Sequence, residues 1–282
     1  MREQFNLDLN AVVTRETDVS RAQLADLLYA NDQEYFRAGA EIEVIEDWRV
    51  VRVDGFPDLA AACVLEPPHG KSTPPRLLLE RLRALNIAAV RFYCPNTTLQ
   101  ETATPPFDLT REAAYVLDVR TSRVEQPNMD LVVRPLKSDE DPIKVELYSS
   151  RNGSPDGKHS NPHHYVALER LKIDAGYMQG FIVEDRGVPA ACFGLSVTHN
   201  LVRMKNLLTS TKAHGRGCGT AIVHHAIKVA REYGKHHVGV FAIEGGAGQR
   251  LYERCGMRRI GIQTEYSAPL AALIRKDQIC QN

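Results

Sequence analysis

The sequence predicts an α/β protein with a mixed sheet, built as two consecutive units. The chain has 282 residues, which is long for one compact domain. Strand-like and helix-like segments alternate along it. One of these segments, NLLTSTKAHGRGCGTAIVHHAIKVAREYG, runs from an apolar strand through a glycine-rich loop into a long amphipathic helix. Hydrophobic residues make up 43% of the chain and charged residues 25%, which is ordinary for a globular protein.

Residues 1–125 are expected to form the first unit, an N-terminal α/β domain. Its first helix spans residues 18–37, where Leu24, Leu28 and Tyr35 fall on one face. Apolar runs bounded by turn residues predict the remaining elements. These are strands at 48–53 and 59–65, a helix at 76–85, and strands at 88–94 and 113–119.

A second unit is expected at residues 131–268. Residues 120–130 are polar and contain a proline, so we interpret them as a linker, and residues 269–282 remain as a C-terminal tail or helix. Strands are predicted at 131–134, 180–184, 190–198, 201–209, 237–243 and 259–266, and helices at 139–149, 165–175, 217–233 and 247–255. The two units repeat a similar order of elements. The first is therefore either a degenerate copy of the second or an unrelated α/β domain.

Composition argues against several classes of protein. Lys plus Arg equals Asp plus Glu, at 35 each, whereas a nucleic-acid binder usually carries a basic excess. The first residues contain no apolar run, so no secretory signal is expected, and no stretch has the roughly 20 apolar residues of a membrane span. The six cysteines are scattered without a C-x-x-C pair. We therefore expect a cytoplasmic protein with reduced thiols, no metal, and no nucleic-acid or membrane partner.

The glycine-rich loop between residues 209 and 220 is the most informative segment. Gly215, Gly217 and Gly219 alternate directly before the long helix. Glycines let the backbone approach a bulky ligand closely, and the free N–H groups of a helix N-terminus bind anionic phosphate. Arg216 adds a cation at the same place. The loop therefore predicts a phosphate-binding site.

Two common phosphate-binding motifs do not fit this loop. The P-loop requires Lys-Ser or Lys-Thr after its last glycine, and neither follows Gly219. The dinucleotide fingerprint G-x-G-x-x-G requires a third glycine where Ile222 stands. A different phosphate-binding family is therefore indicated.

Residues 131–268 resemble the GNAT acetyltransferase superfamily. Its signature, Gln/Arg-x-x-Gly-x-Gly/Ala between a bent strand and a long helix, resembles His214-Gly215-Arg216-Gly217-Cys218-Gly219. Its downstream Leu-Tyr-x-x-x-Gly-Phe pattern is similar to Leu251-Tyr252-Glu253-Arg254-Cys255-Gly256-Met257. The two motifs occur in the family's order and on the expected elements, so together they are specific.

The resemblance implies acetyl-CoA as co-substrate and a set of site residues. The strands at 201–209 and 237–243 would splay apart, and a bulge in the first would leave backbone groups at Leu207, Leu208 and Thr209 for the pantetheine arm. The pyrophosphate would lie against residues 214–220, comprising His214, Gly215, Arg216, Gly217, Cys218, Gly219 and Thr220. Tyr252 is the candidate catalytic acid that protonates the departing thiolate. For Cys218 we expect a small apolar role rather than a nucleophilic one.

The base that deprotonates the acceptor amine is left open. Glu244, after the strand at 237–243, and His199, before the strand at 201–209, are both candidates that could act through water. His159, His163 and His164 lie in the loop that covers the acceptor in the family, where they could contact substrate or solvent.

The function implied is N-acetyl transfer from acetyl-CoA to an amine of a small molecule or peptide. The alternative is a non-catalytic acyl-CoA-binding regulatory module. Three departures from the family pattern favour the alternative: His214 replaces Gln or Arg, Gly245 replaces Asn, and Leu201 stands near the position of a frequent acidic base. The sequence leaves the acceptor open, and it also leaves a homodimer open.

Overall fold

The structure is a computed structural model that describes residues 20–68, 71, 73–95, 107–122, 128, 130–150, 161–198 and 201–279. The helices of this part are α1 (Arg21–Arg37), α2 (Arg76–Ala84), α3 (Asp141–Ser149), α4 (Pro162–Asp174), α5 (Cys218–Glu232), α6 (Ala247–Arg254) and α7 (Leu270–Ile279). Its strands are β1 (Glu41–Ile45), β2 (Trp48–Arg52), β3 (Cys63–Glu66), β4 (Ala89–Pro95), β5 (Asp108–Asp118), β6 (Leu131–Pro135), β7 (Gln179–Asp185), β8 (Val188–Val197), β9 (Leu201–Thr209), β10 (His237–Ile243) and β11 (Arg258–Pro269).

All these strands join one 11-stranded mixed sheet. Its order is β1-β2-β3-β4-β11-β5-β10-β9-β8-β7-β6. The β3–β4 and β9–β10 pairs are parallel, and the other pairs are antiparallel. The predicted fold class, an α/β protein with a mixed sheet, is thereby confirmed.

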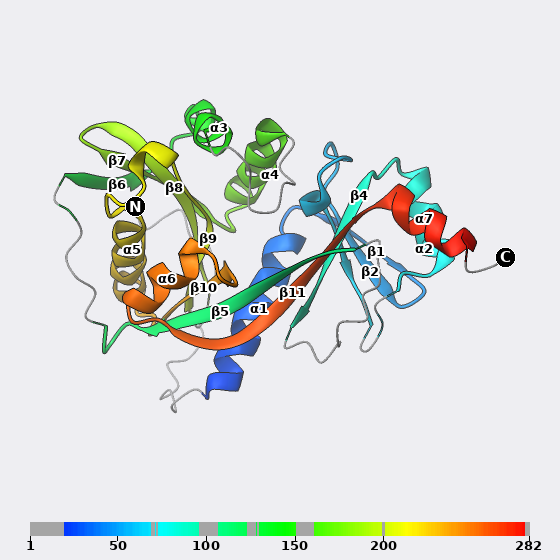
Figure 1. The fold of residues 1–282 in the computed structure, drawn as a ribbon, viewed down its shortest axis with the longest axis horizontal. Coiled ribbons are helices and arrows are strands. Elements are labelled where there is room, and N and C mark those ends of the chain that lie inside the picture. The colour runs from blue at the N-terminus through cyan, green and yellow to red at the C-terminus, as the bar shows by residue number, and fades with distance from the viewer. Residues whose placement is uncertain are drawn as a thin grey trace.

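Two long strands join the halves of the molecule. β5 precedes the linker in sequence, yet it pairs with both β10 and β11. β11 follows the last helix of the second half, yet it pairs with β4 of the first half along residues Gln263 to Pro269. Figure 1 shows both strands running the length of the molecule between its two ends. The strand pairing runs across the predicted division into units at 1–125 and 131–268, and that division stays a prediction.

Helices cover both faces of the sheet. On one face of β10, Val238, Val240 and Ala242 pack in a core with α5 and α6. On the opposite face, Leu28 of α1 packs against Ala114 and Val116 of β5. α3 covers that same face over β7 and β8, whereas α2 and α7 pack on the far end of the sheet around Trp48 and Phe92. This alternation follows the two-residue period of strands.

α1 lies close against the sheet because of its local sequence. Ser20 and Gln23 form a reciprocal capping box that fixes the start of the helix. At Gly239 of β10, a Cβ atom would lie 2.7 Å from a methyl carbon of Leu28, so only glycine lets α1 come this near. The close packing of α1 defines one wall of the cavity described below.

Candidate functional site

Strands β9 and β10 diverge at the centre of the sheet. They pair over only three positions, from Leu201–His237 to Arg203–Gly239. Further along β9, three residue steps from Lys205 to Leu208 oppose two steps on β8, so Asn206 and Leu207 have no ladder partner on β8. Asn206 has a positive φ of 54°, as expected for the extra residue of a bulge. The predicted splay and the predicted bulge are both confirmed.

A groove opens where the strands diverge, and we call it the loop groove. It has a volume of about 840 Å³ and lies between the β9 bulge, the glycine loop and helix α6. Most of the predicted site residues line it, namely Leu207, Thr209, His214, Gly215, Gly217, Cys218, Gly219, Thr220 and Tyr252. The structure therefore brings together residues that the sequence separates by up to 45 positions.

Glycine is needed at Gly217 and at Gly219 for different structural reasons. Gly217 is the N-cap of α5 with φ 91°, a conformation that side chains with a Cβ rarely adopt. Gly219 is helical, but a Cβ there would lie 2.5 Å from a methyl carbon of Leu251, so it permits close packing of α5 on α6. Among the described residues no side chain caps α5, which leaves N–H groups of its first turn available to an anion in the loop groove.

Two predicted residues direct their side chains elsewhere. Arg216 Nε lies 2.7 Å from Asp185 Oδ2, and Arg216 lines a neighbouring cavity rather than the loop groove. The Leu208 side chain is buried on the opposite face of the sheet in a cluster with Leu147 and Ile182. Only the backbone of Leu208 faces β8, where it pairs with Cys192.

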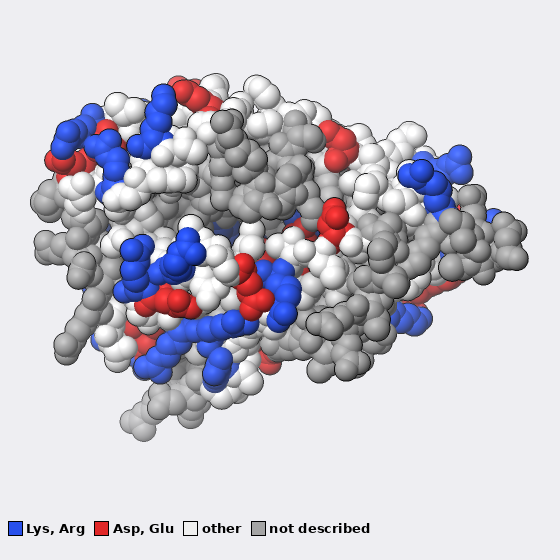
Figure 2. Space-filling view, in the orientation of Figure 1, with Lys and Arg blue, Asp and Glu red and all other residues white. Residues whose placement is uncertain are grey.

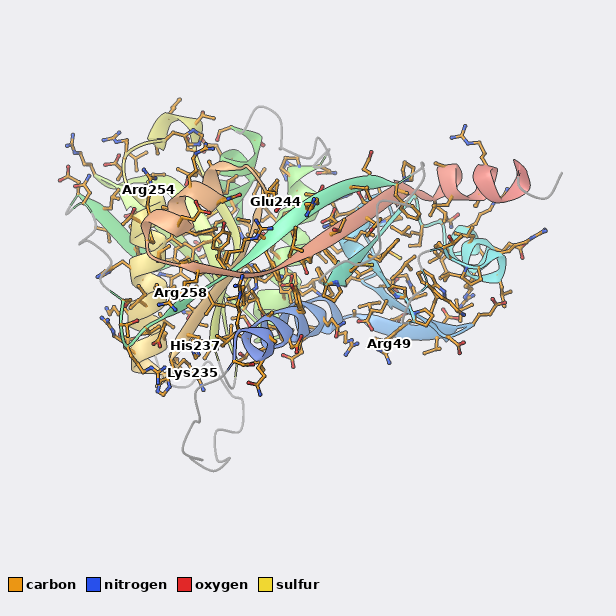
Figure 3. All side chains as sticks on the ribbon, turned by 60° about the horizontal axis from the view of Figure 1, so that its bottom comes forward. Arg49, Lys235, His237, Glu244, Arg254 and Arg258 are labelled. Atoms are coloured by element: carbon orange, nitrogen blue, oxygen red, sulfur yellow. The ribbon has the colours of Figure 1, made fainter. Side chains whose placement is uncertain are left out.

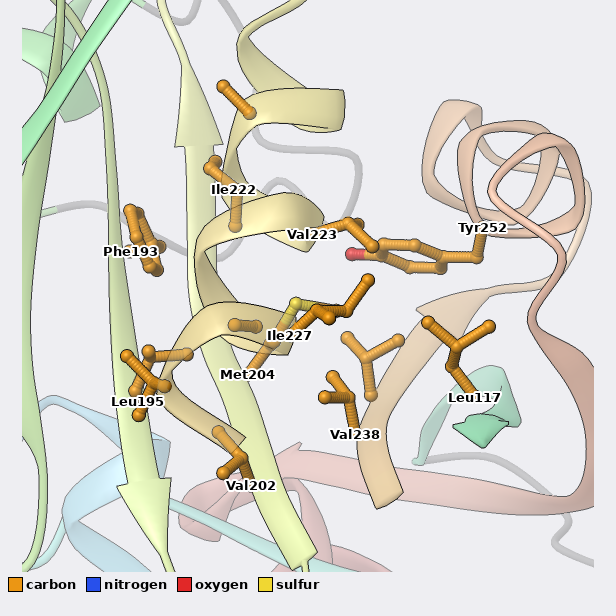
Figure 4. Packing of buried hydrophobic residues seen from close by; sticks show 14 of the residues in the cluster. Leu117, Phe193, Leu195, Val202, Met204, Ile222, Val223, Ile227, Val238 and Tyr252 are labelled. Atoms are coloured by element: carbon orange, nitrogen blue, oxygen red, sulfur yellow. The ribbon is translucent and has the colours of Figure 1, made fainter. Parts of the chain in front are cut away.

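Tyr252 of α6 is buried, with 4% of its surface exposed. Figure 4 shows its ring between α6 and α5, with the hydroxyl pointing toward Val223. Burial raises the pKa of the Tyr252 phenol above its ordinary value, so the hydroxyl keeps its proton. Among the residues that the structure describes, none is hydrogen-bonded to this hydroxyl.

A second, smaller cavity lies beneath α1, and we call it the inner cavity. It has a volume of about 250 Å³. Tyr252 and Leu207 line both cavities, so the inner cavity and the loop groove meet at these two side chains. One wall is the sheet face, with Arg91, Glu112, Arg203, Lys205, Phe241 and Glu265, and the other is formed by α1 and α4, with Asp32, Tyr35, Phe36, Tyr165, Leu168 and Lys172.

The inner cavity is strongly polar and is built by both halves of the chain. Asp32 of α1 binds Arg203 at 3.1 Å and Lys205 at 2.5 Å. Burial opposes ionisation of Asp32, but the two cations hold its pKa below the ordinary value. Arg91 pairs with Glu265 at 3.2 Å. The sequence prediction missed all of these residues, although charged residues inside apolar strands were a visible signal.

Glu112 of β5 is the acidic group best placed to accept a proton. It receives a hydrogen bond of 2.7 Å from Gln263 Nε2 and has no cation within ion-pair distance in the described part of the chain. Burial, with a contribution from the negative charge of Glu265, raises the pKa of Glu112 to about 7. A carboxyl with this pKa takes up and releases protons near neutral pH.

The predicted base candidate Glu244 does not line the inner cavity. Glu244 pairs with Arg111 at 3.0 Å and Arg259 at 2.5 Å, and Figure 3 shows it beside β5. His163 and His164 lie in the first turn of α4 rather than in a loop, and His164 Nδ1 is 3.1 Å from Asp58. His159 and His199 lie outside the described residues.

The described part of the chain has a mixed surface charge and no candidate metal site or membrane-spanning helix. Figure 2 shows basic and acidic side chains interspersed over one face of the molecule, in keeping with the zero net charge. The described helices are all too short or too polar to cross a membrane. No group of three or more His, Cys, Asp or Glu side chains in the described ranges could hold a metal ion.

Comparison with solved structures identifies the fold. A functionally unknown conserved protein from Staphylococcus epidermidis superposes with a TM-score of 0.60 at 13% identity, over 82% of this chain and 95% of that one. A GCN5-related N-acetyltransferase from Kribbella flavida gives 0.57 at 15%, over 87% and 95%. A tandem GNAT protein from the clavulanic acid biosynthesis pathway gives 0.52 at 11%, over 79% and 78%, which fits a two-part arrangement.

Comparison of the sequence with protein families gives a more direct assignment. No curated protein matches the sequence. Residues 145–257 match the acetyltransferase (GNAT) family, a segment that includes the β9 bulge, the glycine loop and Tyr252. The chain therefore carries a GNAT-family acetyltransferase domain at residues 145–257, on a fold shared with GCN5-related N-acetyltransferases.

Proposed function

We propose that this protein transfers the acetyl group of acetyl-CoA directly to an amine of a small molecule. The family match and the fold support acyl transfer in general. The observation that carries the finer proposal is the junction of the two cavities at Tyr252 and Leu207. A coenzyme in the loop groove and an amine in the inner cavity would meet there.

The loop groove suits coenzyme A in shape and chemistry. Its volume of about 840 Å³ lies within the range of ligand pockets. The N–H groups of the first turn of α5 would bind the pyrophosphate, and the diverging edge of β9 would pair with the pantetheine arm like an added strand. The unpaired backbone at Asn206 and Leu207 would donate an N–H to the thioester oxygen as negative charge develops on it.

The inner cavity supplies the proton transfers of the proposed reaction. Glu112 would accept a proton from the ammonium form of the acceptor, which frees the nitrogen lone pair to attack the thioester carbon. The C–S bond then breaks, and Tyr252 would give its proton to the departing thiolate. The new amide nitrogen loses its second proton in the same step, and this proton restores the phenol of Tyr252. The size of the inner cavity, about 250 Å³, favours a small molecule over a peptide as acceptor.

Coenzyme binding and turnover test the proposal separately. Calorimetry should detect coenzyme A binding to the wild type. Gly217→Val, which places a β-branched residue at φ 91°, should weaken that affinity at least tenfold. Gly234→Val is the matched control, because Gly234 has φ 62° just beyond the other end of α5 with open space around it.

Thiol release with acetyl-CoA and a panel of amines then separates the enzyme from a non-catalytic acyl-CoA-binding module. Release that depends on the amine supports the enzyme. Binding without release for any amine supports the module instead. Equal coenzyme affinity in wild type and Gly217→Val would contradict both.

A further inference from the structure

Some charged side chains of the inner cavity have ion-pair partners, and others do not. Asp32 is shared by two cations, Arg203 and Lys205, and Glu265 pairs with Arg91. The remaining acidic groups of the wall are Glu169 and Glu112, and Glu169 is paired with Lys144 behind the wall. Within the described residues, Glu112 is thus the carboxylate of the cavity that has no cation within ion-pair distance, although the charge of Arg203 acts on it from farther away.

Among the cations of the cavity wall, Lys172 of α4 is the one without an ion-pair partner among the described residues. Lys172 Nζ donates to the carbonyl oxygens of Phe36 at 2.9 Å and Ala38 at 2.5 Å, at the C-terminal end of α1. The described part of the chain offers no carboxylate within ion-pair distance of it. Every other cation of the cavity wall has an acidic partner. One ammonium and one carboxylate without ionic partners therefore line the same small cavity.

The lysines of the cavity form a crowded cationic site. Lys205 Nζ lies 3.9 Å from the centre of the Tyr35 ring, and Lys172 Nζ lies 5.7 Å from the same ring. Desolvation, with repulsion from Lys205, lowers the pKa of Lys172 to about 8. Both lysines are almost fully buried, and only Lys205 has a carboxylate partner, Asp32. An anion beside Lys172 would therefore replace lost solvation and relieve the repulsion between the two ammonium groups.

These charges indicate the chemistry of the acceptor. Resting on the proposed function, we infer that the acceptor is a small aminocarboxylate whose carboxylate binds Lys172 and Lys205 and whose amine faces Glu112. The cavity volume of about 250 Å³ is below the range of drug-sized pockets, which suits a molecule of amino-acid size. A merely structural role of Lys172, capping the carbonyls of α1, gives no preference for a carboxylate in the substrate.

Matched pairs of acceptors test the inference with the wild-type protein. α-Amino acids, β-alanine and 4-aminobutyrate are each compared with the amine that lacks the carboxylate, and thiol release from acetyl-CoA gives kcat/KM. The best aminocarboxylate should exceed its paired amine at least tenfold. Equal or better use of the simple amines would overturn the inference while the proposed function stands.

A variant of Lys172 tests the position of the carboxylate. Lys172→Met should lower the kcat/KM preference for the aminocarboxylate over its paired amine about tenfold or more, mainly through KM, and Lys172→Arg should restore most of that preference. Lys228→Met is the matched control, because Lys228 is an exposed lysine on α5 whose nearest acidic partner is Glu232.

Two outcomes would contradict these expectations in different ways. Equal losses on both members of a pair in Lys172→Met would show a structural cap and overturn the inference. Absence of thiol release with every amine, including the simple ones, would instead contradict the proposed function, and the inference with it.

Discussion

At the scale of single residues, Tyr252 connects the two cavities through one hydroxyl group. Tyr252→Phe removes that hydroxyl and retains the buried ring. Because a general acid typically contributes 10²-fold or more, we expect kcat to fall about 100-fold with little change in KM for acetyl-CoA. Steady-state thiol release measures both constants.

Tyr115→Phe is a suitable control for that change. Tyr115 packs against Tyr252 with ring centres 6.0 Å apart, but its hydroxyl donates to Glu253 at 2.8 Å instead of facing either cavity. Unchanged turnover is expected for it. If Tyr252→Phe retained full activity, the phenol could not be the proton donor.

Glu112 gives the protein a distinctive pH dependence. As the base, it must be ionised, so kcat/KM should rise with pH through an apparent pKa near 7 and be lost below it. Glu112→Gln should abolish this rise of kcat/KM with pH, and with it most of the activity. A rise that persists unchanged in Glu112→Gln would assign the base to another group.

The same carboxyl should affect stability in the opposite direction. Its pKa is raised from 4.5 to about 7 on folding, so its contribution is fully present below pH 4.5 and is lost as pH rises through 7. The free energy of unfolding of Glu112→Gln, relative to that of the wild type, should therefore increase by on the order of 2 kcal/mol from pH 5 to pH 8. Urea unfolding at the two pH values measures the difference, and no change in it would argue that Glu112 is well solvated.

Sequence patterns predicted residues of the loop groove but missed the charged residues of the inner cavity. Tyr252 and the glycine loop lie within short contiguous motifs, so residue type and spacing were sufficient to find them. Glu112, Arg91 and Glu265 lie on strands far apart in sequence, and only the strand pairing brings them beneath α1. No local pattern reports that pairing.

At the scale of elements, the bulge in β9 depends on a single backbone conformation. Asn206 has φ 54°, and its side-chain amide donates to the Tyr35 hydroxyl at 3.1 Å. Asn206→Val should cost roughly 1–3 kcal/mol and straighten the strand, because a β-branched residue disfavours this conformation. Acetyl transfer should fall with it, as measured by thiol release.

Asn206→Gly provides the comparison for that prediction. It retains the backbone conformation and loses only the amide contact to Tyr35. Transfer close to wild type is expected. Equal loss in the two variants would assign the effect to the side chain instead of the bulge.

Local sequence predicted most elements but not their partners. β9 and β10 have the predicted bounds, since both are apolar runs between clear turns. β1 was missed because its sequence EIEVI is short and alternates with acids, and the predicted strand at 59–65 begins as a 3₁₀ turn at 60–62. The crossing of β5 and β11 depends on contacts between distant segments, which periodicity does not encode.

At the scale of the whole molecule, the two halves share strands and should unfold together. We expect a single calorimetric transition in which the calorimetric and van't Hoff enthalpies agree. Residues 131–282 produced alone would leave β10 without β5 and β11 without either neighbour, so this fragment should be insoluble or unstructured. Two separate transitions, or a folded fragment by circular dichroism, would contradict the shared sheet.

The late position of β11 in the chain also bears on how the protein is made. The ribosome releases β4 long before residues 258–269, which pair with its second edge. Until then the nascent first half exposes an open strand beside the apolar side chains of Phe92 and Val90. Translation of residues 258–269 is therefore the step that closes this edge, and chaperones that shield apolar segments should remain bound until these residues have emerged.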